Sequence, residues 1–95
     1  MNKYKVSNFH NKNQFVIETD NEYIFQSYNS TCAFVTKDNN ELWVCLDYVD
    51  YSKTTSKHLR MFINEYSQYS IPTDTTLKKW ALCKAKQGTI KVFNK

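Results

Sequence analysis

The sequence predicts an α+β fold in which an antiparallel five-stranded β-meander is followed by two helices and a short C-terminal strand. Up to about residue 50, short segments of alternating apolar and polar residues are separated by Asn and Asp, as in strands joined by tight turns. Beyond that point apolar residues recur at helical spacing. The 95 residues, 41% apolar and 23% charged, predict a single domain, 1–95, with the meander in 1–49 and a basic helical part with the terminal strand in 50–95.

The five strands are expected at residues 3–9, 14–19, 22–28, 31–37 and 41–47. The turns between them fall at residues 10–13, 20–21, 29–30 and 39–40. They contain Asn or Asp, which tolerate left-handed backbone and bond their own main chain. Hairpins centred on 29–30 and on 39–40 fix the register. They place Phe25 opposite Phe34, Ile24 opposite Val35, Val35 opposite Val44, and Phe34 opposite Cys45.

This register makes both faces of the sheet apolar. One face collects Phe15, Ile17, Ile24, Ala33, Val35, Leu42, Val44 and Leu46. The other collects Val16, Tyr23, Phe25, Cys32, Phe34, Trp43 and Cys45. One face can form the core, whereas the other must be covered, paired with a second chain or used for binding. The aromatic set of the second face, Tyr23, Phe25, Phe34 and Trp43, could stack bases, but it equally fits a core or a homodimer interface.

Two amphipathic segments predict the helices. The first helix is expected over 53–68, with Ser52 or Thr54 as its N-cap. The second is expected over 75–87, capped by Asp74 and ended by Gly88, the only glycine, which suits a left-handed C′ position. Their apolar stripes are Leu59, Phe62, Ile63 and Tyr66 in the first helix, and Leu77, Trp80, Ala81 and Ala85 in the second. Residues 89–93 predict a strand that adds to a sheet edge.

The two halves of the chain differ in charge. Residues 1–50 hold four basic and seven acidic residues, a net charge of −3, whereas residues 51–95 hold nine basic and two acidic residues, a net charge of +7. This asymmetry predicts a basic surface that binds an anionic partner. The alternative interpretation is a lysine-rich helix surface that only faces solvent. The candidate binding residues are Tyr51, Lys53, Lys57, Arg60, Lys78, Lys79, Lys84 and Lys86, with Tyr51 as an aromatic anchor.

The densest polar run, residues 50–58, places hydroxyls and lysines at a predicted helix N-terminus, where a phosphate or carboxylate can be held. The alternative is a redundant N-cap. The run lacks the glycines of a P-loop, so nucleotide hydrolysis is not indicated. Asp47, Asp50 and His58 follow no spacing rule for acid–base or metal chemistry, and no nucleophile elbow is present. We therefore expect no enzymatic activity.

Three cysteines, Cys32, Cys45 and Cys83, have no C-x-x-C spacing, and the two histidines are far apart. A structural zinc site needs four such ligands in close pairs, so we expect no metal and no cofactor. The cysteines are expected to be small buried side chains in a reducing compartment. The longest apolar run, residues 42–46, is far short of the roughly 20 residues that span a bilayer, and no signal peptide is visible. We expect a cytoplasmic protein without a membrane partner.

Residues 25–30 (FQSYNS), 50–59 (DYSKTTSKHL) and the Lys-x-Gly-x-Ile-x-Val stretch at 86–92 resemble a family of small uncharacterised proteins from phages and prophages of low-GC Gram-positive bacteria. The resemblance implies an accessory gene product of a mobile element, and such products often inhibit host defence, anti-CRISPR proteins among them.

The leading expectation is a non-enzymatic interaction protein that inhibits a host-defence complex in the host cytoplasm. It would bind a host protein or ribonucleoprotein complex through its basic face. The alternatives are a sequence-tolerant accessory protein that binds DNA or RNA, and a dimeric structural accessory protein.

Overall fold

The computed structural model describes residues 5–94 and contains one six-stranded sheet in the order β1-β2-β3-β4-β5-β6. The strands are β1 (Lys5–Asn8), β2 (Gln14–Glu18), β3 (Glu22–Ser27), β4 (Ser30–Thr36), β5 (Leu42–Cys45) and β6 (Lys91–Phe93). A 3-10 turn, η1 (Leu46–Tyr48), leads to the helices α1 (Lys53–Tyr66) and α2 (Leu77–Lys86). β1 to β5 form the antiparallel meander, and β6 pairs parallel to β5. The predicted fold class is confirmed; residues 3 and 4 of the first predicted strand lie outside the described residues.

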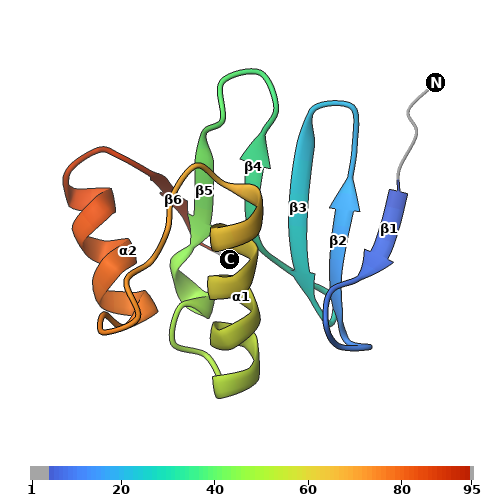
Figure 1. Cartoon of the computed structure of the whole chain (residues 1–95), viewed down its shortest axis with the longest axis horizontal. Coiled ribbons are helices and arrows are strands. Elements are labelled where there is room, and N and C mark those ends of the chain that lie inside the picture. The colour runs from blue at the N-terminus through green and yellow to red at the C-terminus, as the bar shows by residue number, and fades with distance from the viewer. Residues whose placement is uncertain (1–4, 95) are drawn as a thin grey trace.

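Figure 1 shows α1 in front of the sheet and α2 beside its β6 edge, so neither helix lies over the opposite face. The predicted stripes face inward: Leu59, Phe62 and Ile63 of α1 are fully buried, and Leu77, Trp80 and Ala81 of α2 are buried. The apolar spacing in the sequence therefore predicted which side of each helix packs. Neither helix within residues 5–94 is long and apolar enough to cross a membrane.

The helix ends agree with the sequence only in part. Ser52 caps α1 by accepting a hydrogen bond from the Thr55 amide at 3.1 Å. The prediction that Asp74 caps the second helix is wrong, because a turn in which the Thr75 amide donates to the Pro72 carbonyl delays the start of α2. Thr76 is its N-cap and accepts from the amide of Lys79 at 3.2 Å. Gly88 has φ +75°, as predicted for a C′ residue.

The register predicted for the β3–β4 hairpin is wrong by one residue. Its turn consists of residues 28 and 29, since Ser27 pairs with Ser30, and a bulge between Phe25 and Gln26 shifts the pairing again. Phe25 therefore lies opposite Ala33, and Ile24 opposite Phe34. A one-residue shift exchanges the two faces of a strand, so the predicted face assignments of β2 and β3 are inverted relative to β4 and β5.

The register predicted for the β4–β5 hairpin is wrong by two residues, which leaves the faces of its strands intact. The loop holds four residues, 37–40, and closes where the Thr36 amide donates to the Glu41 carbonyl at 3.0 Å. Val35 consequently pairs with Leu42 rather than Val44, and Phe34 with Trp43 rather than Cys45. The core under α1 thus combines Val16 and Phe25 with residues of β4 and β5: Ala33, Val35, Leu42 and Val44.

The face opposite α1, called the rear face below, carries one row of side chains that crosses all six strands. Successive strand pairs place these residues directly opposite each other: Val6, Ile17, Ile24, Phe34, Trp43 and Lys91. Phe34 and Trp43 are stacked with ring centroids 5.5 Å apart, and the Lys91 ammonium lies 5.8 Å from the Trp43 ring. The sequence correctly indicated two apolar faces, although it distributed the residues between them incorrectly.

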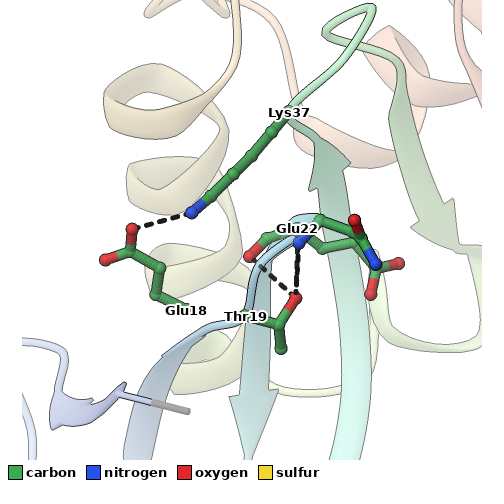
Figure 2. A network of polar contacts seen from close by, with 5 residues as sticks. Glu18, Thr19, Glu22 and Lys37 are labelled. Atoms are coloured by element: carbon green, nitrogen blue, oxygen red, sulfur yellow. Dashed lines mark hydrogen bonds and ion pairs between the residues drawn. The ribbon is translucent and has the colours of Figure 1, made fainter. Parts of the chain in front are cut away.

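A polar network closes the end of the sheet at the β2–β3 turn (Figure 2). The Thr19 hydroxyl oxygen accepts hydrogen bonds from the amides of Asn21 and Glu22, which fixes the turn. Lys37, at the end of β4, reaches across to Glu18 with an Nζ to Oε2 distance of 2.8 Å. Both side chains are partly exposed, so this ion pair is screened by salt and contributes little to stability.

We expect this ion pair to appear in the titration of Glu18. The hydrogen bond from Lys37 lowers the pKa of Glu18, and the same contact raises the pKa of Lys37. Because the pKa of the carboxyl is lowered on folding, its contribution is present above the unfolded pKa and is lost as pH falls through the folded pKa. An NMR titration should show Glu18 ionising below ordinary glutamates, and Lys37→Ala should abolish that difference. Identical curves for the two proteins would contradict the contact.

Candidate functional site

A cavity of about 570 Å³ opens between the first half of α1 and the N-terminus of α2, and is called the basic cleft below. Its lining residues are Val49, Asp50, Lys53, Ser56, Lys57, Arg60, Thr76, Leu77 and Lys78. Four of the eight predicted binding residues are therefore brought together around one cavity by two helices that are separated in sequence. Pro72 lies in the segment between these helices and prevents one continuous helix, and residues from both helix N-termini line the cavity.

The basic cleft is electropositive. Its lining has four cationic side chains and one carboxylate, a net charge of +3. Lys78 lies 3.6 Å from Asp50, but both side chains are exposed and the pair is weak. Within residues 5–94, the side chains of Lys53 and Lys57 form neither a hydrogen bond nor an ion pair. These two ammonium groups are therefore available to a ligand.

Arg60 has a structural role that the sequence did not indicate. Its Nη2 donates to the carbonyl oxygens of Pro72 and Thr75, and so ties α1 to the segment that precedes α2. Neutral carbonyl oxygens do not cancel the guanidinium charge, and the remaining nitrogens keep their donors. Arg60 thus holds one wall of the basic cleft in place and contributes a positive charge to it.

Two lysines of the basic cleft, Lys53 and Lys78, occupy positions that a helix disfavours. The N-terminus of a helix carries about half a positive charge, so a cation in the first turn costs about 0.3–1 kcal/mol and an acidic residue stabilises. Neither α1 nor α2 has an acidic residue in its first turn. Instead Lys53 begins α1, and Lys78 is the second residue of α2. A bound anion would relieve this repulsion.

The other predicted lysines lie elsewhere on α2. Lys79 is exposed in the first turn but does not line the basic cleft. Lys84 and Lys86 are in the last turn, where they complement the negative end of the helix dipole. A ten-residue helix is about 15 Å long, so these two ammonium groups are at the far end of α2 from the basic cleft.

A second cavity, of about 320 Å³, adjoins the other side of the α1 N-terminus and is called the tyrosine pocket below. It is lined by Ser27, Tyr28, Ser30, Tyr48, Tyr51 and Thr55. The Ser27 and Thr55 hydroxyls are hydrogen-bonded to each other at 3.1 Å and are buried. The sequence pointed to Tyr51 but not to Tyr28 or Tyr48. The only signal in the sequence was that residues 25–30 and 50–59 both carry the family resemblance. The sequence does not show that these two segments are in contact.

Tyr28 is held in an unfavourable backbone conformation. Its φ is +54°, which bulky side chains rarely adopt. Two hydrogen bonds fix the peptide: the Tyr28 amide donates to the Asn13 carbonyl, and the Tyr28 carbonyl accepts from the Gln26 side chain, both at 2.7 Å. Tyr28 is 60% exposed. Tyr51 is 69% exposed and meets Tyr48 edge-on, with ring centroids 5.3 Å apart.

The predicted aromatic interface does not exist as one surface. Phe25 is fully buried in the core, and Tyr23 packs on Tyr66 with ring centroids 5.2 Å apart. Only Phe34 and Trp43 lie on the rear face, because the one-residue register shift separates the two pairs. The cation beside Trp43, Lys91, is also 3.7 Å from Glu41, so this face does not form a basic groove. That the protein forms a homodimer stays a prediction.

The histidine and cysteine residues considered as possible metal ligands do not form a site. His58 is buried, and its Nδ1 lies 2.7 Å from the Thr54 carbonyl. Cys32 and Cys45 are buried as expected, whereas Cys83 is exposed, so the expectation of burial is wrong for Cys83. Burial raises the pKa of Cys32 to about 12, which keeps this thiol protonated and unreactive. Among residues 5–94, no three His, Cys, Asp or Glu side chains are grouped to hold a metal ion.

A third cavity, also of about 570 Å³, lies between the β2–β3 and β4–β5 turns. Three carboxylates and one lysine line it: Asp20, Glu22, Asp38 and Lys37. The net negative charge disfavours an anionic ligand at this end of the sheet. The basic cleft and the tyrosine pocket therefore form the candidate site.

Comparison with known proteins identifies the family. Residues 2–78 match the model of DUF8033, a family of unknown function, and the chain belongs to this family. The matched region includes the meander, α1 and the start of α2, and hence every residue that lines the basic cleft and the tyrosine pocket. No curated protein and no solved structure matches the chain.

Proposed function

We propose that this member of DUF8033 is a non-enzymatic binding protein that holds the phosphate backbone of a nucleic acid in the basic cleft. The observation that carries the proposal is the convergence of Lys53, Lys57 and Lys78 with two helix N-termini around one electropositive cavity. Lysine ammonium groups and the free amides of helix N-termini are the groups that bind phosphate oxygens in proteins. Such contacts fix a nucleic acid without reading its sequence, so the binding is sequence-tolerant.

A biological setting follows from the resemblance of the sequence to phage and prophage proteins. In that setting the partner is a ribonucleoprotein of a host-defence system, whose exposed RNA supplies the phosphates, and the protein acts in the host cytoplasm as its inhibitor. The phage origin, the inhibition and the location stay predictions. They are tested by expressing the protein in a host that carries such a system and by measuring whether defence is lost.

The phosphate contacts are tested by reversing two charges. We expect the double variant Lys53→Glu, Lys57→Glu to lose affinity for single-stranded oligonucleotides of every sequence alike. The slope of log affinity against log salt should become shallower by about 0.7 for each phosphate that the variant no longer binds. The thermal stability should be unchanged or slightly higher, because the carboxylate introduced at position 53 would lie in the first turn of α1, at the positive end of its dipole. Fluorescence anisotropy at several salt concentrations and thermal unfolding provide the two measurements.

The matched control is Lys84→Glu, Lys86→Glu, which changes the net charge equally at the far end of α2. We expect this variant to retain most of the affinity of the unaltered protein. Equal losses in the two double variants would show that net charge, and not the basic cleft, determines binding. Absence of binding to any oligonucleotide at low salt would overturn the proposed function itself.

A further inference from the structure

We infer that the tyrosine pocket takes one unstacked base of the single strand whose phosphates lie in the basic cleft. The inference rests on the proposed function and adds to it a second, separate binding site. It also defines the ligand class as single-stranded nucleic acid, since the bases of an intact duplex are stacked and paired and do not reach a side pocket.

The first step is the placement of the two cavities. The segment 48–57 runs between them and lines both. Tyr48, Tyr51 and Thr55 face the tyrosine pocket, whereas Lys53 and Lys57 face the basic cleft. Opposite sides of one helix N-terminus thus present a charged site and an aromatic one. Proteins that bind single strands combine these two elements, a positive groove for the backbone and aromatic side chains for the bases.

The second step is the chemistry of the pocket lining. None of its six residues is charged: three are tyrosines, two are serines and one is a threonine. The two exposed rings, Tyr28 and Tyr51, offer faces on which a flat group stacks, and hydroxyl groups both donate and accept hydrogen bonds. A neutral, planar heteroaromatic group with polar edges fits this lining, and a nucleobase is such a group. Because hydroxyls can exchange donor and acceptor roles, the pocket suits all four bases.

The third step excludes the main alternative for an aromatic pocket, which is a cation. Tyrosine rings attract ammonium and guanidinium groups. Here, however, the basic cleft with its net charge of +3 adjoins the pocket and would repel the Lys or Arg side chain of a partner. The same charge attracts a strand that carries phosphates and offers neutral bases.

The strained backbone of Tyr28 supports the same assignment. Its left-handed φ costs free energy that a different turn residue would avoid, and the ring is held exposed at the pocket. With the backbone already held, only the side-chain torsions of Tyr28 have to be ordered when a base stacks on its ring. Tyr28, from the β3–β4 turn, and Tyr51, from the segment before α1, thus place two exposed rings at one pocket.

The test compares a normal single strand with one that has the same backbone and no bases. Fluorescence anisotropy is measured with oligodeoxyuridylate and oligouridylate of about ten nucleotides, and with abasic deoxyribose phosphate of equal length. We expect the unaltered protein to bind the strands with bases about 5- to 150-fold more tightly than the abasic strand. Tyr51→Ala should remove this difference, whereas Tyr51→Phe, which keeps the ring face, should retain it. The deoxyribose and ribose strands show which sugar the site accepts.

The outcomes separate the two proposals. Equal affinity of the unaltered protein for normal and abasic strands would overturn the base pocket and leave the phosphate site standing. Tyr51→Ala with undiminished preference for bases would overturn it too. Leu82→Ala, an exposed apolar truncation on α2, is the control for nonspecific effects, and thermal unfolding confirms that each variant is folded.

Discussion

Phe62→Ala is expected to lower the free energy of unfolding by about 3–5 kcal/mol, the largest single effect that we predict. Phe62 is fully buried where α1 meets the sheet. Its ring stacks on Phe25 and on Tyr66 at centroid distances of 5.6 and 5.1 Å, and lies 6.4 Å from Phe9. Removal of the ring leaves a cavity among side chains from α1, β3 and the β1–β2 loop, which cannot all move in to fill it. A loss of this size is a large fraction of the total stability of a small domain.

Urea unfolding followed by circular dichroism measures this effect. Phe62→Leu, which refills much of the volume, should lose much less, and Leu82→Ala on the exposed face of α2 should stay within about 0.5 kcal/mol of the unaltered protein. If Phe62→Ala were as mild as Leu82→Ala, α1 would not pack on the sheet as described. If Phe62→Ala does not fold at all, Phe62→Leu should still be less stable than Leu82→Ala, and this comparison tests the same packing.

The fold could be predicted from the sequence because its two kinds of element have different periods. Alternation up to residue 50 and the helical stripe that includes Leu59 and Phe62 identified the meander and α1. The register could not be predicted, because it depends on where each turn closes. Tyr28 occupies the first position of the β3–β4 turn despite its unfavourable φ, and no propensity rule anticipates that choice. The bulge at Phe25 then inverts the faces of the strand.

The sequence predicted some of the residues of the candidate site but not how they are arranged in space. Lys53, Lys57 and Lys78 were selected for their charge, and the structure places them around one cavity. The same criterion selected Lys84 and Lys86, whose position at the end of α2 has an electrostatic explanation of its own. The tyrosine pocket was missed because it needs a turn and a helix start to meet, and such a contact between distant segments depends on the register of β3 and β4.

Gln14→Met is expected to raise the free energy of unfolding, by about 1–3 kcal/mol. Gln14 is fully buried at the start of β2, and neither its side-chain nitrogen nor its oxygen has a hydrogen-bond partner among the described residues. A buried amide without partners loses its hydration on folding and gains nothing in exchange. Methionine has nearly the same length and shape and no polar atoms, so it fills the site without that cost. The melting temperature should rise by about 4–8 °C for each kcal/mol.

The surroundings of Gln14 provide the control with the opposite sign. Gln14 pairs across the sheet with Ser27, whose hydroxyl is hydrogen-bonded to Thr55. Ser27→Ala would leave the buried Thr55 hydroxyl unpaired and should destabilise the protein, whereas Gln14→Met leaves that hydrogen bond intact. A lower stability of Gln14→Met would show that the carboxamide is hydrogen-bonded in solution, and would contradict the prediction.

A stabilising change would mean that the chain keeps an unfavourable polar group beside Ser27, a residue that lines the tyrosine pocket. Natural sequences retain such local conflicts mainly where a functional site requires them.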